Sequence, residues 1–318
     1  MNAISDALLA SVASCFSCGR RQSLTIEGHT VVVRKRLAAG GFSLIDLVEE
    51  ESTGRLLALK RISCHGPQDE AAALREVQVH KQVRHPHLID LVGHRLLSLR
   101  GAQLGPTSEL QLLLPYYQRG SLAYELERRQ QGGNHLSESL LLALFKQVTE
   151  AVQCLHQAGL AHRDIKPHNV LLDDDFSAIL MDLGSATAAK VQVCGSSDAC
   201  RLQDEAAEKS SMPYRAPELF NVDSYCTVDQ RTDIWSLGCL IYAMAFYKSP
   251  FDPVYERGDS VALAVLSGNI EIPENSTYSQ GLHELILSML KVNASERPFV
   301  EDILKIVSQL ELAAQSRV

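Results

Sequence analysis

The chain of 318 residues is poor in aromatic side chains, at 6%, and has a single tryptophan and no dense run of lysine or arginine. Its formal net charge is −8, which argues against broad nucleic-acid binding. No apolar run approaches the roughly 20 residues that cross a bilayer, so we expect any membrane contact to be peripheral. The 46% of apolar residues suffices for a sizeable core, and wholesale disorder is not expected.

The cysteines are few for the length of the chain and do not show the close spacing of a disulfide-rich domain. Eight cysteines are scattered along a chain long enough to bury a core without cross-links, which indicates free thiols in a reducing compartment. A chain of this length is typical of a two-lobed enzyme with one shared active site. The cysteines are Cys15, Cys18, Cys64, Cys154, Cys194, Cys200, Cys226 and Cys239.

Residues 1–29 are predicted to form a flexible leader, and they lack the basic start and long apolar segment of a secretory signal. Cys15 and Cys18 stand beside a glycine and two arginines and are candidates for palmitoylation. Two free thiols in a flexible segment explain them equally well. Half a zinc site fits less well, because no second pair of cysteine or histidine stands nearby.

The next hundred residues predict a small antiparallel sheet with one helix. The helix covers 71–83 and ends before His85-Pro86, where proline disfavours its continuation. β-Branched and apolar residues separated by glycine and polar turns predict the strands. The expected strands are 31–33, 44–48, 56–62, 88–92 and 110–114.

From residue 121 the pattern becomes helical. Ser137 is a plausible N-cap for a helix whose apolar face continues to Gly159. Later helices are expected at 232–247, 260–267, 279–291 and 300–312. The predicted fold class is therefore α+β, with a small sheet lobe followed by a larger helical lobe.

The segment His162–Asn169 carries the strongest chemical signal. Asp164 can accept a proton from a hydroxyl, Lys166 can neutralise a transferring phosphate, and Asn169 offers an oxygen to Mg²⁺. A merely solvated charged loop would not explain this order of residues ahead of a strand-like segment. The spacing predicts phosphoryl transfer from ATP.

Two further segments supply candidates for metal and phosphate binding. Asp182 follows a short strand and precedes Gly184, which suits a second Mg²⁺ ligand, although such a pair alone is usually a turn. Lys60 lies on an apolar strand and needs an opposite charge if it is buried. Glu76 on the following helix is the expected partner, with Glu70 as a rival.

The order of these motifs along residues 30–312 resembles that of the eukaryotic protein kinase family. Three further matches follow in the same order: Ala216-Pro217-Glu218, Asp233–Gly238 and Arg297. The resemblance implies a bilobal kinase fold, with an N-lobe at 30–114, a hinge at 115–120, a C-lobe at 121–312 and a short tail at 313–318. It also implies that Asp233 anchors the catalytic loop and that Glu218 pairs with Arg297.

The resemblance further implies a nucleotide site for ATP with Mg²⁺, or with Mn²⁺ in its place. Leu114 would be the gatekeeper before the adenine hinge, and Ile45, Ala58 and Leu171 would enclose the base. The implied nucleotide-binding residues are Leu37, Ala38, Ala39, Gly40, Gly41, Phe42, Ser43, Leu44, Ile45, Ala58, Lys60, Glu76, Leu114, Tyr116, Tyr117 and Leu171.

Three positions depart from the family pattern. Ala38 and Ser43 replace the first and third glycines of the glycine-rich loop, and Ala38 puts ATP affinity in question. Leu183 replaces the common phenylalanine between Asp182 and Gly184 at little expected cost.

The chain is more similar still to the acylated, Golgi-associated branch of the Numb-associated kinase family. The segments 40–43, 59–65, 181–185 and 258–265 carry this similarity. It implies a cytoplasmic enzyme, peripheral on Golgi or other membranes, with a short helix in the activation segment around 202–208. Members of that branch begin with Met-Gly, whereas Asn2 excludes N-myristoylation if the chain starts at Met1.

The sequence thus predicts a monomeric serine/threonine protein kinase, because Lys166 and Ser211 match that version of the family rather than the tyrosine version. It is expected to phosphorylate proteins and itself. Arg163 could pair with a phosphate on Thr187, Ser196, Ser197, Ser210 or Ser211. The alternative is a pseudokinase scaffold, which commonly lacks one of the catalytic groups that are all present here. A small-molecule phosphotransferase fits poorly with the long activation segment.

Overall fold

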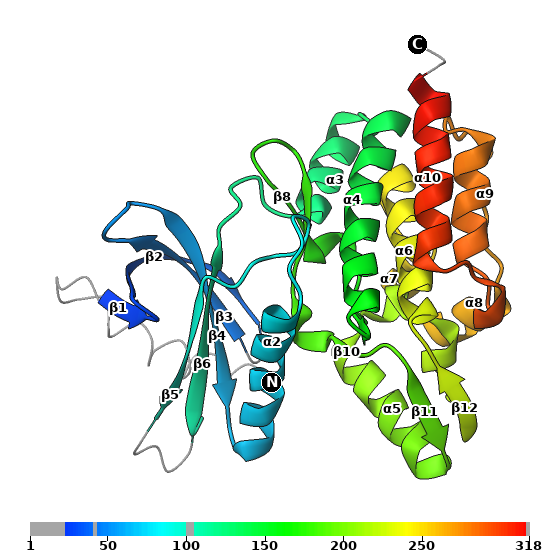
Figure 1. Ribbon diagram of the computed structural model, residues 1–318. Helices are drawn as coiled ribbons and strands as arrows, with labels where there is room; N and C mark the ends of the chain where they lie inside the picture. Colours follow the sequence, from blue (N-terminus) through cyan, green and yellow to red (C-terminus); the bar gives the residue numbers. More distant parts are fainter. Residues whose placement is uncertain (1–22, 41–42, 100–104, 316–318) are drawn as a thin grey trace. The chain divides into compact units, whose positions relative to one another are not determined.

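The computed structural model describes residues 23–40, 43–99 and 105–315, which form two compact units. One unit comprises the chain up to Glu70 together with Leu91–Tyr116, and the other comprises Ala71–Asp90 and the chain from Tyr117 onward. The first is mainly a sheet and the second is mainly helical (Figure 1). The α+β class with a sheet part before a helical part is therefore confirmed.

The first unit is a six-stranded antiparallel sheet in the order β1-β2-β3-β4-β6-β5. One face of the sheet is apolar because residues alternate along each strand, and a buried cluster that includes Val48, Leu57, Leu59 and Leu113 covers it. The strands are β1 (Ser23–Ile26), β2 (His29–Ala39), β3 (Ser43–Glu50), β4 (Leu56–Cys64), β5 (Gly93–Ser98) and β6 (Ser108–Pro115).

Two sequence predictions for this unit were wrong. The strand expected at 88–92 is absent, and β5 (Gly93–Ser98) follows it instead. The apolar residues Leu88 and Ile89 are buried in the helical unit and not in the sheet. Leu88 makes only an isolated bridge, to Leu180. The predicted leader 1–29 includes β1, which a turn at Glu27 and Gly28, both with positive φ, joins to β2.

The second unit contains the helices and several short strands. Figure 1 shows α10 alongside α4, and the two helices pack against each other. Its helices are α2 (Pro67–Gln82, shared with the first unit), α3 (Leu122–Gly132), α4 (Glu138–Gln157), α5 (Ser196–Lys209), α6 (Arg231–Phe246), α7 (Asp252–Glu256), α8 (Val261–Ser267), α9 (Gln280–Met289) and α10 (Val300–Gln315).

The remaining elements are single turns and two-stranded ribbons. The ribbons pair β7 (Leu160–Ala161) with β10 (Thr187–Ala188), β8 (Val170–Leu172) with β9 (Ala178–Leu180), and β11 (Val191–Cys194) with β12 (Tyr225–Val228). The 3₁₀ turns are η1 (Pro167–Asn169), η2 (Leu183–Ser185), η3 (Met212–Tyr214), η4 (Pro217–Leu219) and η5 (Ala294–Glu296).

The helix α4 forms as its sequence predicts. The Ser137 hydroxyl accepts a hydrogen bond from the Leu140 N–H at its start, and Gly159 takes a φ of 74° just after its end. The apolar face lies in the main core with Trp235, which stacks on Phe251 at a ring distance of 5.7 Å. This helix ends directly before the ribbon strand β7 and the segment His162–Asn169.

The helix α5 is longer than the sequence predicted. The similarity at 202–208 implied a short helix, and the structure extends it to Ser196–Lys209. α3 lies in the stretch where a helical pattern was expected, although no bounds were predicted for it. The β11–β12 ribbon was not predicted, because its two strands are far apart in sequence. The six cysteines within the described ranges are free thiols. No helix built from the described residues is long and apolar enough to span a membrane.

Candidate active site

The segment His162–Asn169 is a buried loop between β7 and β8. His162, Arg163, Asp164 and Asn169 are all buried, although each is polar or charged. Arg163 takes a φ of 70°, which is unfavourable for a residue with a side chain and persists only where its surroundings hold it. The loop therefore depends on anchors outside it.

Asp233, in the first turn of α6, is the main anchor. Its carboxylate accepts hydrogen bonds from the backbone N–H groups of His162 at 2.8 Å and Arg163 at 2.9 Å, and it contacts the His156 ring at 2.9 Å. Burial alone would raise the pKa of Asp233, but these hydrogen bonds and the neighbouring histidines lower it below its ordinary value. The carboxylate thus stays charged and holds the loop, as the sequence implied.

The Asp164 carboxylate is the point on which the predicted catalytic groups converge. Lys166 Nζ donates to Oδ2 at 2.7 Å, and Asn169 Nδ2 donates to the same oxygen at 2.9 Å. Ser211 lies in the activation segment, and its backbone N–H donates to Oδ1 at 2.9 Å. Lys166 also donates to Ser211 Oγ at 2.6 Å. The structure therefore brings together the residues that the spacing identified.

The hairpin of β8 and β9 places Asn169 opposite the residue before Asp182. The Met181 N–H donates to the Asn169 carbonyl at 2.8 Å, and the His162 ring bonds the Met181 carbonyl at 3.0 Å. Asp182 has a φ of 64°, a second left-handed residue at this site. Both expected metal ligands thus lie at the same end of one hairpin.

Gly184 is needed for close packing around Asp182. A Cβ at this position would lie 3.1 Å from Glu76 Oε2 and 3.4 Å from Asp182 Oδ1. Glu76 is buried on α2. The three residues therefore form a tight acidic neighbourhood that any larger residue at position 184 would disturb.

A second anchor, the pair of Glu218 and Arg297, holds the end of the activation segment. The two guanidinium Nη atoms donate to the two carboxylate oxygens, each at 2.8 Å, and Arg297 also donates to three backbone carbonyls. Its side chain has no exposed surface. This bidentate pair confirms the pairing that the resemblance implied.

In the first unit, the glycine-rich segment is the hairpin of β2 and β3. Ala38 pairs with Ile45 and Ala39 with Leu44, and the Gly40 N–H donates to the Ser43 carbonyl at 2.8 Å. Leu37 is exposed, and two register shifts interrupt β2 before it reaches the turn. Gly41 and Phe42 lie outside the described residues.

The same sheet presents the other expected nucleotide-binding side chains on one face. In the register, Lys60 pairs with Ile45 and Leu112, and Ala58 pairs with Leu114. Paired residues share a face, so this face is opposite to the apolar cluster of the unit. Tyr116 ends this unit, whereas Tyr117, Glu76 and Leu171 belong to the other. The pair of Lys60 with Glu76 and the enclosed adenine remain predictions.

Comparisons with known proteins agree with this geometry. Residues 31–307 match the family model of the protein kinase domain. The chain belongs to the protein kinase family. It is 44% identical to serine/threonine-protein kinase 16 of rat and of human, and 43% identical to the mouse protein. Each match covers 92% of this chain and 92% of the relative.

In this protein kinase, the sequence did not predict the contact of His156 with Asp233 or the cavity that Arg163 lines under α5. His156 faces Asp233 from 77 positions away, and only the meeting of α4 with α6 brings them together. Its place in the last turn before the catalytic loop was the available signal.

Among the described residues, no group of three or more histidine, cysteine, aspartate or glutamate side chains is arranged to hold a metal ion.

Proposed function

We propose that this protein kinase is catalytically active and transfers the γ-phosphoryl group of ATP to serine and threonine hydroxyls of proteins. The observation that carries the proposal is the Asp164 carboxylate, which Lys166, Asn169 and Ser211 hold in one orientation. Phosphoryl transfer requires mainly positioning and electrostatic stabilisation, and this arrangement supplies both.

In the proposed reaction the acceptor hydroxyl oxygen forms a bond to the γ-phosphorus while the bond from that phosphorus to the β,γ-bridging oxygen breaks. Asp164 accepts the hydroxyl proton, and ADP leaves with the bridging oxygen and its electron pair. Lys166 lies 2.7 Å from Asp164, so its ammonium group can neutralise charge on the transferring phosphoryl group.

The preference for serine and threonine rests on Lys166 and Ser211. Their contact at 2.6 Å places a lysine and a small residue beside the proposed base, as in the serine/threonine version of the family. The relatives described above carry that specificity in their names.

Asn169 and Asp182 fit as ligands of Mg²⁺, and Mn²⁺ suits the same oxygen donors. Asn169 donates through Nδ2 to both the carbonyl and the carboxylate of Asp164, which leaves its amide oxygen as the group available to a cation. The glycine at 184 avoids crowding this carboxylate, since a Cβ there would lie 3.4 Å from Asp182 Oδ1. When bound, the ion would neutralise phosphate charge.

The nucleotide site is proposed to use the hairpin from Leu37 to Ile45 and the Lys60–Glu76 pair. Leu114 would act as gatekeeper, with adenine at Tyr116 and Tyr117 and between Ile45, Ala58 and Leu171. A pseudokinase scaffold gains no support, because every catalytic group of the family is present and the base is held by three donors.

We further propose autophosphorylation at Ser196 and Ser197. Both are exposed in the first turn of α5, where free N–H groups favour a phosphate. The hydroxyls of Ser210 and Ser211 are already bonded, to Ala206 and Lys166.

We also propose a cytoplasmic monomer acting in membrane trafficking or signalling, peripheral on Golgi or other membranes. Its membrane contact would use Cys15 and Cys18, which lie outside the described residues.

The variant Asp164→Asn tests the proposed activity. It should lower kcat for phosphorylation of a serine peptide by a factor of ~10²–10⁴, because the general base is lost, while ATP binding stays nearly unchanged. The measurements are transfer of labelled γ-phosphate and the thermal shift produced by Mg·ATP. Asp175→Asn, the same change at an exposed turn residue, is the control. Wild-type turnover in Asp164→Asn would refute the assignment.

A further inference from the structure

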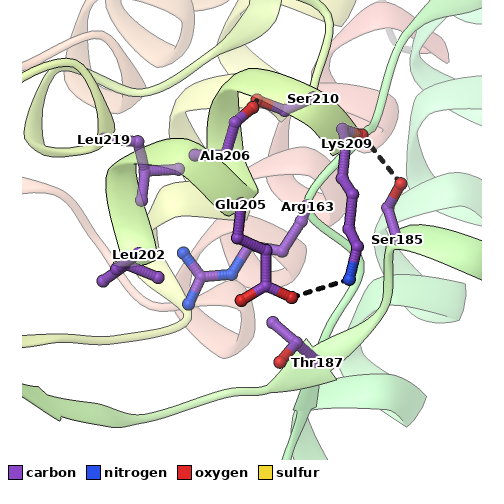
Figure 2. A pocket seen from close by; sticks show the side chains of 9 residues that line it. All are labelled: Arg163, Ser185, Thr187, Leu202, Glu205, Ala206, Lys209, Ser210 and Leu219. Atoms are coloured by element: carbon purple, nitrogen blue, oxygen red, sulfur yellow. Dashed lines mark hydrogen bonds and ion pairs between the residues drawn. The ribbon is translucent and has the colours of Figure 1, made fainter. Parts of the chain in front are cut away.

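A small cavity lies under α5, between the activation segment and the catalytic loop. Its volume is about 20 Å³, close to the space of one or two water molecules. Figure 2 shows the Arg163 side chain entering it from the catalytic loop and Glu205 entering it from α5. The lining residues are Arg163, Ser185, Thr187, Leu202, Glu205, Ala206, Lys209, Ser210 and Leu219.

Arg163 is 8% exposed, and none of its three guanidinium nitrogens has a hydrogen-bond partner among the described residues. Burial lowers the pKa of this guanidinium, and the charges of Asp233, Glu218, Glu205 and Asp229 oppose that effect. A buried cation without a counter-charge is costly, and Arg163 stands directly before the catalytic Asp164. What neutralises Arg163 therefore bears on the geometry of the catalytic loop.

Three of the four carboxylates are committed elsewhere. Asp233 holds two backbone N–H groups and a histidine, and Glu218 and Asp229 each accept two or more hydrogen bonds from another arginine. Glu205 differs from them, because Lys209 contacts only its Oε1, at 2.7 Å. It is also the carboxylate that lines the cavity together with Arg163.

α5 is held in place at the end that carries Glu205. Ser185 Oγ, just after the Asp182–Gly184 motif, donates to the Lys209 carbonyl at 2.7 Å (Figure 2). Arg215 Nε donates to Ser210 Oγ at 2.8 Å and so fixes the residue that follows the helix. Glu205 is therefore presented to Arg163 by a helix with two separate attachments.

A phosphate on the exposed serines of α5 would not reach this cavity while α5 keeps its position. The exposed Ser196 and Ser197 lie nine and eight residues before Glu205, at least about 12 Å along a helix axis. A phosphate on either serine would thus act at the other end of α5.

We propose that Glu205 is the built-in counter-charge of Arg163, so that folded α5, rather than an activation-segment phosphate, positions the catalytic loop. Glu205 is a positioning residue: it acts on Asp164 through Arg163 and touches neither substrate nor nucleotide. The dephosphorylated enzyme is accordingly active. This inference rests on the proposed kinase activity.

The variant Glu205→Gln, compared with wild type after phosphatase treatment of both, tests the proposal. We expect the dephosphorylated wild type to keep its kcat and Glu205→Gln to lose about tenfold, with KM for ATP unchanged. Glu208→Gln, an exposed glutamate on the same helix, should match the wild type. Loss of activity on dephosphorylation of the wild type, or a Glu205→Gln enzyme with full activity, would overturn the proposal.

Two further variants separate a charge effect from a structural one. Thr187 lines the same cavity from β10, so Thr187→Glu added to Glu205→Gln should restore most of kcat by supplying the carboxylate from another element. Lys209→Gln should keep wild-type activity, because Glu205 then faces Arg163 alone. Failure of the first to restore kcat, or a loss in the second equal to that of Glu205→Gln, would contradict the proposal.

These outcomes can be told apart from failure of the kinase assignment itself. If the assignment is wrong, Asp164→Asn and wild type show equal transfer of phosphate. If only the present inference is wrong, Asp164→Asn is inactive while Glu205→Gln behaves as the wild type does.

Discussion

The catalytic loop and the glycine-rich hairpin serve one predicted reaction, yet they are built in opposite ways. The loop from His162 to Asn169 is largely buried, and its carboxylate and backbone N–H groups are bonded to residues from two other segments, α6 and the activation segment. The hairpin is exposed from Arg36 to Gly40, and in the part of the turn that the structure describes the Gly40 N–H donates to the Ser43 carbonyl.

The difference follows from what each segment must do. A group that takes a proton or stabilises a transferring phosphoryl group has to be in place beforehand, because reorganising it during the reaction would add to the barrier. A segment that covers phosphates with backbone groups can adapt when the nucleotide arrives. Substitutions should therefore be costly in the loop and mild in the hairpin.

Among the variants that compare the loop with the hairpin, the largest effect is expected from Lys166→Met, which removes a charge from the catalytic loop. The rate constant kcat should fall by a factor of ~10²–10³, the usual consequence of losing one group that stabilises the transition state. KM for ATP should stay within about twofold of the wild type, since the change affects the transition state alone. Steady-state kinetics measure both, with the exposed Lys190→Met as control. A loss confined to KM would show that Lys166 binds the ground state.

A smaller effect, on folding, is expected from Asp233→Asn. Removing one charge from a buried hydrogen-bonded group should reduce the free energy of unfolding by about 3 kcal/mol, which urea titration measures. The exposed Asp223→Asn should change it by less than about 0.5 kcal/mol. Equal stability of the two variants would mean that the loop does not depend on Asp233.

The same variant has a defined pH dependence. The folded-state pKa of Asp233 is lowered, so its charge contributes stability that is fully present above the unfolded pKa of about 3.9 and is lost as pH falls through the lower folded value. The difference between wild type and Asp233→Asn should hence stay constant from pH 8 to 5 and shrink only in strong acid. A difference that shrinks near pH 6 would assign the effect to a histidine instead.

The smallest effect is expected from Ala38→Gly in the hairpin, which restores the usual glycine. Added backbone freedom there is worth up to about 1 kcal/mol, so KM for ATP should change by less than about fivefold and kcat should not change. Initial-rate measurements over a range of ATP concentrations decide this. A change larger than tenfold would mean that position 38 constrains the nucleotide, and would end the contrast between hairpin and loop.

Local patterns predicted what local forces decide. The spacing within His162–Asn169 places Lys166 and Asn169 on Asp164 through a single loop and turn, and the Ser137 cap starts α4 as its hydroxyl dictates. The strand predicted at 88–92 failed, because a short apolar run is the same signal whether its burial comes from a sheet or from a helical core. β1 was missed although its β-branched residues and the turn at Gly28 were visible.

By itself, the sequence determined the two-part α+β organisation, the residues of the reacting centre and their order, since these depend on spacing and on side-chain chemistry. The tertiary structure alone decided which distant groups meet. His156 reaches Asp233 across 77 positions, and Glu205 shares a cavity with Arg163 only because α5 folds over the catalytic loop. Such contacts depend on how helices pack, and no pattern of neighbouring residues records that packing.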